Sequence, residues 1–265
     1  VTFNNTGSLT FYNANYNFNG GVTYAGLLTV INANFISNNA PITFGNILVS
    51  FGSLGITSNG GNITVGNINS GDVASYNASI NSGAGTITLN GGIGATTSFN
   101  NVFIDSTGVG NNLVVNNNIA AASSIIINIG GGISGTATYT TGYLRVVSIS
   151  GGLVNLNNAN AVSTFDGVNN NGNLIFNNTL ALALDRLTVV GNVTLTNTGA
   201  LTQTGSFRTN VSGTTSLSVG ANAITLTAPL SAGIGNIFTG ALTLSNSGAN
   251  DINILGTSNY ILAAS

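Results

Sequence analysis

The clearest pattern along the chain is a recurring triplet in which an aliphatic residue, a threonine and a second apolar residue follow one another. Alternation of apolar and polar positions is typical of a strand with one buried face. Four triplets lie 20, 21 and 24 residues apart, at residues 22–24, 42–44, 63–65 and 87–89. Further copies lie at 193–195, 224–226 and 242–244, and an offset series lies at 9–11 and 28–30. The pattern predicts short strands that return with a fixed period.

Clusters of glycine and asparagine separate these strands, as at Asn19–Gly21, Asn59–Gly61 and Asn90–Gly92. Such residues supply the positive φ angles of tight turns. A period of roughly 20–24 residues with two or three short strands matches one coil of a parallel β-helix. One coil cannot bury its own apolar face, so the coils must stack. The sequence therefore predicts an all-β fold, a right-handed parallel β-helix (β-solenoid), as a single domain over residues 1–265.

Roughly a dozen coils, with strands about 4.8 Å apart, would give a rod on the order of 55–60 Å long. Aliphatic and phenylalanine side chains would point inward, and threonine and asparagine ladders would line the outside. The alternative is a β-sandwich or a pair of sandwiches, which the recurrence of the repeat disfavours. The asparagine-rich segment 157–179 is expected to be a loop excursion or an irregular coil. Segment 180–187 is the best helix candidate, but its Leu-Ala alternation favours a strand with alanine outward.

The composition removes several classes of function. The chain has 3 basic and 5 acidic side chains and no histidine, and charged residues make up 3% of the sequence. Three scattered arginines cannot neutralise a phosphate backbone, so we expect no nucleic-acid partner. No apolar run reaches about 18 residues, so we expect no insertion into a membrane. Without histidine, lysine, glutamate or cysteine, the usual general bases and nucleophiles are missing, and we expect no enzymatic activity.

Two segments resemble the repeats of a known family. Residues 85–104 (GTITLNGGIGATTSFNNVFI) and 237–252 (IFTGALTLSNSGANDI) resemble repeats of large bacterial exoproteins of the filamentous haemagglutinin and autotransporter type. The turns Asn17–Gly20 and Thr164–Gly167 are similar to the Asn/Asp–Phe–polar–Gly turn of that family. The resemblance implies a right-handed β-helix that is secreted and located outside the cell or on the bacterial surface. It also implies a role in adhesion or biofilm.

Few side chains could form a chemical site. Asp166 and Asp185 are 19 residues apart and could stack on adjacent coils, but two aspartates in turns or on the surface are the preferred interpretation. Asp185 and Arg186 are neighbours, so in a regular strand they would point to opposite faces. No cofactor is expected. Calcium is the most plausible if one exists, at the oxygen-rich segments 166–172 or 250–251, although calcium usually needs several carboxylates.

Both ends of the sequence look like uncapped strands. Val1, Thr2 and Phe3 begin the chain, and Tyr260, Ile261 and Leu262 lie near its end. Solenoids without polar caps and charged edges tend to pair end to end. We therefore predict an extracellular structural protein that assembles head to tail with copies of itself into a filament.

The predicted subunit interface consists of the six residues just named and Phe11. Phe11 belongs to a group of N-terminal aromatics, for which the preferred interpretation is a stack inside the first coils. The alternative function is an adhesin shaft or passenger segment that binds glycans or host surfaces.

Overall fold

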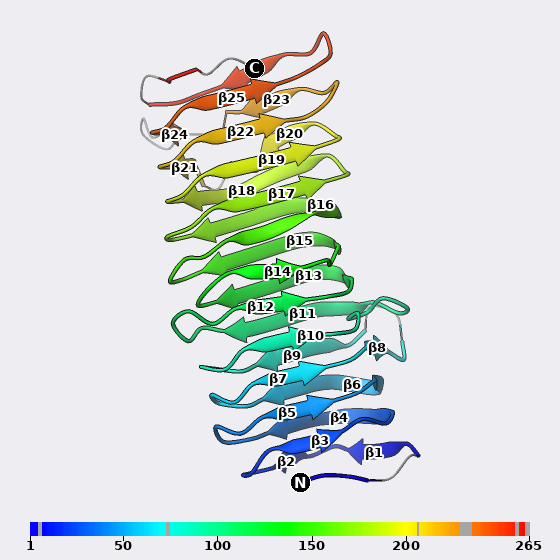
Figure 1. Cartoon of the computed structure of the whole chain (residues 1–265). Coiled ribbons are helices and arrows are strands. Elements are labelled where there is room, and N and C mark those ends of the chain that lie inside the picture. Colours follow the sequence, from blue (N-terminus) through cyan, green and yellow to red (C-terminus); the bar gives the residue numbers. More distant parts are fainter. Residues whose placement is uncertain (5–6, 73–74, 206, 228–234, 258–259, 263–265) are drawn as a thin grey trace.

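The chain folds into a rod of stacked parallel strands. A computed structural model describes residues 1–4, 7–72, 75–205, 207–227, 235–257 and 260–262. These residues form 26 strands and no helix, and strands of successive coils pair in parallel. Figure 1 shows the coils stacked one above another, with the two termini at opposite ends. The prediction of an all-β parallel solenoid is confirmed.

The first face of the solenoid, sheet A, is a ladder of short strands that contains most of the predicted triplets. Its strands are β3 (Val22–Tyr24), β5 (Ile42–Phe44), β7 (Ile63–Val65), β10 (Ile87–Leu89), β12 (Leu113–Val115), β14 (Ile133–Gly135), the start of β16 (Val154–Asn169), β17 (Leu174–Asn178), β19 (Val193–Asn197), β22 (Thr215–Ser218) and β25 (Leu242–Ser245). Equivalent residues of adjacent coils are between 19 (Leu174 to Val193) and 27 (Thr215 to Leu242) positions apart. The coils thus vary more in length than the predicted 20–24 residues.

Sheet B covers the rest of each coil. Its strands are β1 (Leu9–Tyr12), β2 (Asn15–Asn17), β4 (Leu28–Ile36), β6 (Ile47–Thr57), β8 (Ile68–Ser70), β9 (Asn77–Asn81), β11 (Phe99–Ser106), β13 (Ile119–Ile129), β15 (Tyr139–Ser148), most of β16, β18 (Leu182–Val189), β20 (Leu201–Gln203), β21 (Thr209–Val211), β23 (Ile224–Leu226), β24 (Ile237–Phe238) and β26 (Ile252–Ile254). Several long strands have register irregularities near the middle, and Asn32 and Gly52 there have φ values of 50° and 73°. Sheet B therefore has two arms, the first before and the second after this irregularity in each coil. Together with sheet A, the two arms give each coil three faces.

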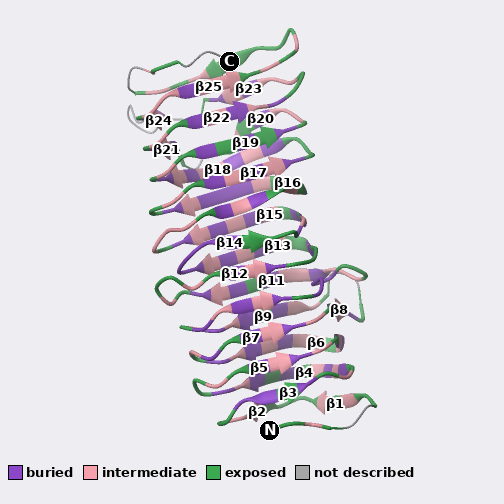
Figure 2. Cartoon of the chain, in the orientation of Figure 1, coloured by how far each residue is buried: buried purple, intermediate pink, exposed green. Residues whose placement is uncertain are grey.

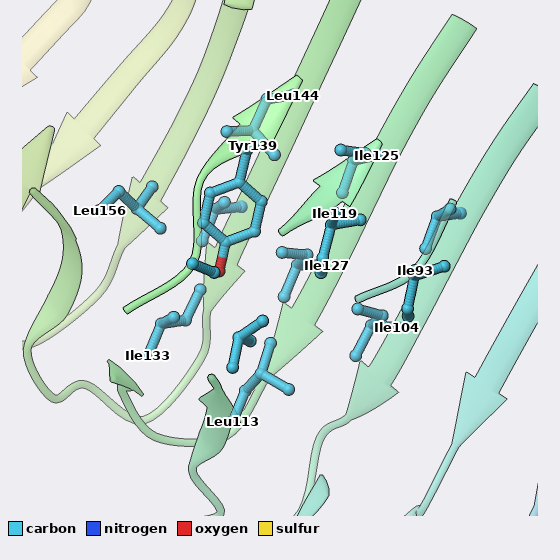
Figure 3. Packing of buried hydrophobic residues seen from close by; sticks show 14 of the residues in the cluster. Ile93, Ile104, Leu113, Ile119, Ile125, Ile127, Ile133, Tyr139, Leu144 and Leu156 are labelled. Carbon is cyan, nitrogen blue, oxygen red and sulfur yellow. The ribbon is translucent and has the colours of Figure 1, made fainter. Parts of the chain in front are cut away.

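The core is a set of columns that run along the rod. Val22, Ile42, Ile63, Ile87 and Leu113 follow one another in register, and each is at most 2% exposed. Figure 2 shows buried positions alternating with less buried ones along the strands. Figure 3 shows aliphatic side chains around Tyr139 in the interior of the solenoid. Burying an aliphatic side chain contributes about 1.5–3 kcal/mol. The columns explain why a coil is stable only when it is stacked.

A column of serines lies at the corner between sheet B and sheet A. Ser82 Oγ donates to the carbonyl of Gly85 at 2.5 Å, and Ser106 Oγ donates to the same carbonyl at 2.6 Å. Ser58 makes the equivalent bond to Gly61. These serines are buried, and their hydrogen bonds satisfy main-chain carbonyls of the turn. The corner is thereby closed in the same way on successive coils.

The asparagine-rich segment 157–179 forms strands, so the expected loop excursion is wrong, whereas the alternative of an irregular coil agrees with register shifts before Asn160 and beside Asp166. It contains most of β16, which is the longest strand, and much of β17. The reason is that Asn160, Asn169 and Asn178 point inward and bond the main chain. Asn160 Nδ2, for example, donates to the carbonyl of Leu156 at 2.8 Å, and its Oδ1 accepts from the amide of Tyr139 at 2.9 Å. Buried amides with partners are compatible with strands that stack in the coil.

Candidate functional site

The N-terminal end of the rod exposes the edge of a strand. Thr2 forms a parallel bridge with Thr23, in which the Phe3 amide donates to Thr23 at 3.2 Å and Thr23 donates to Val1 at 2.9 Å. Because bonding groups alternate along a strand, the N–H and C=O of Thr2 face away from the rod. No described strand pairs with this outer edge. The side chain of Val1 is 61% exposed.

An aromatic cluster forms the last layer of the core at this end. The Phe3 ring lies 6.2 Å from Phe11 and 6.2 Å from Tyr24, and Phe11 lies 4.6 Å from Tyr16 and 5.1 Å from Phe35. The predicted stack inside the first coils is therefore present. Its outer members Phe3, Phe11 and Tyr16 are only partly buried, whereas Tyr24 and Phe35 are fully buried.

The C-terminal end has the same character. Leu262 forms a parallel bridge with Leu242, whose amide donates to the carbonyl of Ile261 at 2.8 Å. Ile261 and Leu262 are 61% and 69% exposed. Tyr260 packs against Phe238 with ring centroids 5.9 Å apart, and its buried hydroxyl has no hydrogen-bond partner among the described residues. By the same alternation, the N–H and C=O of Leu262 face away from the rod.

The predicted interface residues thus fall into two groups at opposite ends of the solenoid (Figure 1). Between the terminal bridges lie ten sheet A pairings, which join eleven strands from β3 to β25. With a further step for each bridge and about 4.8 Å a step, the two groups are roughly 55–60 Å apart. They do not meet within one molecule, so any contact between them joins separate copies.

A charged cluster on the second arm of sheet B was missed by the sequence prediction. Arg145, Asp166 and Arg186 occupy equivalent positions on three successive coils. Arg186 Nε donates to Asp166 Oδ1 at 2.8 Å, and Arg186 Nη2 donates to Asp166 Oδ2 at 2.9 Å. Arg145 Nε lies 3.6 Å from Asp166 Oδ2. The hydrogen bonds from Arg186 hold a carboxylate whose side chain is only 4% exposed, so the expectation of a surface aspartate is wrong for Asp166.

Tyr143 and Asp185 extend this cluster. The hydroxyl of Tyr143 lies 3.2 Å from Oδ2 of both Asp166 and Asp185, and Thr204 Oγ1 donates to Asp185 Oδ1 at 2.8 Å. Burial, with the negative charges of the two aspartates, raises the pKa of Tyr143 to about 12. The hydrogen bond to Asp166 raises the pKa of Arg186 above its ordinary value. The cluster therefore keeps a neutral phenol beside two carboxylates and two guanidinium groups.

The expectation that Asp185 and Arg186 point to opposite faces is wrong. The register shifts between Phe165 and Asp166, where β16 pairs with β18, so that Asp166 faces Arg186 instead of Asp185. Leu184 and Leu187 are buried on either side, and the two residues between them both lie outside the core. A bulge adds one residue without reversing the faces of the flanking segments.

The sequence did contain a signal for the cluster. Residues 145, 166, 186 and 208 are 21, 20 and 22 positions apart, which is the coil period. These positions hold the three arginines of the chain and one aspartate. Testing the charged residues for the same period as the threonine triplets would have placed them on one face.

The structure describes no assembled metal site. Within the described residues, no group of three or more histidine, cysteine, aspartate or glutamate side chains is placed to hold a metal ion. Calcium at segment 166–172 would have to compete with Arg186 for Asp166, and Asp251 is exposed at the other candidate segment. The described part of the chain also contains no helix that is long and apolar enough to cross a membrane.

Comparison with known proteins places the chain among repeat proteins. Residues 30–103 and 171–245, more than half of the chain, match a family described as repeats of unknown function (DUF5649). The chain belongs to this family. The first DUF5649 match runs from within β4 into β11 and the second from before β17 to the end of β25, and the same ladders continue through the residues between them. No curated protein and no solved structure matches the chain.

Proposed function

We propose that this chain is a non-catalytic structural protein whose solenoids join head to tail into an extracellular filament on or near a bacterial surface. The observation that carries the proposal is that no described strand pairs with the outer edges at Thr2 and Leu262. Each edge has outward main-chain groups beside exposed or partly buried apolar side chains. An unpaired edge of this kind favours pairing with another strand.

The occupant that fits each edge best is the opposite end of a second copy. Successive strands of sheet A pair in parallel along the whole rod. The first strand of one copy can therefore pair in the same way with the last strand of another copy. Such a head-to-tail contact is heterologous and extends without closing. None of the charged side chains precedes Asp72 or follows Asp251 in the sequence, so charge repulsion between the ends is weak.

The extracellular location and the bacterial source rest on the resemblance of residues 85–104 and 237–252 to repeats of the filamentous haemagglutinin type. The alternative, an adhesin shaft that binds glycans or host surfaces, is supported by the arginines of the charged cluster and by Phe207, an exposed ring that contacts Arg186. Both functions use the solenoid as a scaffold and need no catalytic group.

Light scattering and electron microscopy of the purified chain test the assembly. We expect fibres with a subunit repeat of roughly 60–65 Å, because the junction between two copies adds one step of about 4.8 Å to the length of one solenoid. Thr2→Pro removes an outward N–H but leaves the bonds to Thr23, and Leu262→Lys places a charge on the opposite end. Both variants are expected to remain monomeric.

The matched control is Val109→Lys, because Val109 is 89% exposed on a lateral turn, away from both ends. This variant should assemble like the wild type. A wild-type chain that stays monomeric at high concentration would overturn the proposal. The same holds if all three variants assemble equally well.

A further inference from the structure

The three cationic side chains of the protein lie on one short strip of the lateral surface. Arg145, Asp166 and Arg186 are in register, and Arg208 directly precedes Thr209, the partner of Leu187, which places it on the coil after Arg186. Asp166 and Asp185 are the carboxylates within this strip. The strip therefore has a net charge of about +1, on a chain whose net charge is −2. It is the place on this acidic protein where an anion is attracted.

Two of the arginines have donors available. Asp166 binds both Nε and Nη2 of Arg186, which leaves Arg145 a contact of 3.6 Å. Arg145 Nε is buried beside Asp166 without a hydrogen bond, but the side chain as a whole is 41% exposed, so the Nη groups are the donors that a ligand can reach. Arg208 is exposed, and no carboxylate of the described residues lies within ion-pair distance of it. One aspartate cannot satisfy three guanidinium groups, so Arg145 and Arg208 can bind a further carboxylate.

An aromatic ring lies beside this strip, on the residue directly before Arg208. Phe207 is 51% exposed, and the guanidinium of Arg186 lies 5.3 Å from its ring centroid. The contact with Arg186 holds the ring in place by a cation–π interaction. An exposed, fixed aromatic ring offers a flat apolar surface against which the C–H groups of a sugar can pack.

We propose that this strip, comprising Tyr143, Arg145, Arg186, Phe207 and Arg208, binds a linear acidic polysaccharide whose sugars carry carboxylates. The chain of sugars lies along the rod. Arg145 and Arg208 each bind a carboxylate through the planar guanidinium fork, and Phe207 packs against a sugar ring. Arg186 and Asp166 hold the strip in shape, and Tyr143 fixes the position of Asp185.

The dimensions agree with a polymer of this kind. Arg145 and Arg208 are three coil steps apart, which corresponds to about 14 Å at ~4.8 Å a step. That distance spans roughly three pyranose units. Two available cations are too few for the phosphate contacts that dominate nucleic-acid binding. The proposal concerns the side of the rod and goes beyond the assembly of its ends, so either can fail without the other.

Titration calorimetry with polygalacturonate tests the site, with fully methyl-esterified polygalacturonate as the matched ligand without charge. We expect binding of the acidic polymer, weaker binding at high salt because exposed charges are screened, and no binding of the ester. The double variant Arg145→Gln/Arg208→Gln should bind at least tenfold more weakly. Phe51→Ala, which removes a 62% exposed aromatic ring outside the strip, should bind like the wild type.

Three outcomes of the calorimetry with polygalacturonate and its ester would overturn the proposal. The first is no binding of polygalacturonate, and the second is equal binding of the acidic and esterified polymers. The third is unchanged affinity in the double variant. Dextran sulfate serves as a further probe, and tighter binding of this sulfated polymer than of polygalacturonate would contradict the carboxylate class. A thermal unfolding curve of each variant verifies that the solenoid is intact.

Discussion

The substitution Asp166→Asn tests whether the charged cluster stabilises the middle of the solenoid. The change keeps the shape of the side chain but removes the charge that two hydrogen bonds from Arg186 and the hydroxyl of Tyr143 share. Arg186 would keep its position beside a neutral amide, and one amide NH2 group would face guanidinium donors. The three coils that contain β15, β16 and β18 would lose the Asp166 charge that links them.

The magnitude follows from the burial of the partners. Removing one member of a buried ion pair costs about 3–5 kcal/mol. Here the carboxylate side chain is 4% exposed, but Arg186 is 27% exposed and Arg145 is 41% exposed. Water can therefore solvate both guanidinium groups in part, which reduces the cost. We expect Asp166→Asn to lower the free energy of unfolding by about 2–3 kcal/mol.

Urea denaturation followed by circular dichroism measures this loss, and hydrogen exchange locates it. Because each coil contacts its neighbours only, faster exchange should be confined to the amides near β15, β16 and β18. Asp105→Asn is the control, since no described cation lies within ion-pair distance of Asp105. In a double-mutant cycle, Arg186→Gln should cost little once Asp166 is already asparagine. Additive effects, or an Asp166→Asn variant as stable as Asp105→Asn, would refute the reasoning.

Two further predictions concern a turn and the response to alkali. Gly135 has a φ of +118°, and an added Cβ would lie 1.9 Å from the carbonyl oxygen of Val115, so Gly135→Ala should cost more than about 2 kcal/mol in urea denaturation. Gly110→Ala, with positive φ but open space, should cost about 1 kcal/mol, and equal costs would refute a steric cause. The pKa of Tyr143 is raised to about 12, so the folded state holds the hydroxyl proton to a higher pH than the unfolded state does. The stability that this difference contributes is lost as the pH rises from about 10 to 12. Thermal unfolding at pH 8–12 should show a smaller alkaline loss for Tyr143→Phe; an identical pH profile would contradict the shift.

Much of the architecture could be predicted because the apolar-polar alternation that forms the strands recurs in the sequence at the coil period. The triplets at 22–24, 42–44, 63–65 and 87–89 pair with one another in register in sheet A. The Leu-Ala alternation near residue 182 likewise forms strand β18, with Leu182 and Leu184 buried. In these segments, each strand pairs with residues about one coil period away, and the pattern of apolar and polar residues marks which side chains are buried. That information is present in the sequence itself.

The failures have a different physical origin. Asparagine is usually a strand breaker, and nothing local shows that the amides of Asn160 and Asn178 turn inward to bond the main chain of adjacent coils. The bulge beside Asp185 depends on how β18 aligns with β16, which the sequence of either strand alone does not determine. The burial of Asp166 needs Arg186 on the next coil, so it becomes predictable only once the coil period is applied to charged residues.

The placement of charge connects the two proposals. A protein with 3% charged residues still gathers five of its eight charged side chains around one lateral strip, and it has none in the sequence before Asp72 or after Asp251. Ends without charged side chains favour stacking, whereas a lateral cluster stays exposed after the ends have joined. A filament would then present one anion-binding strip per subunit, roughly every 60–65 Å along its length. A long acidic polymer could contact several strips at once, so weak binding at a single strip would become strong binding through effective concentration.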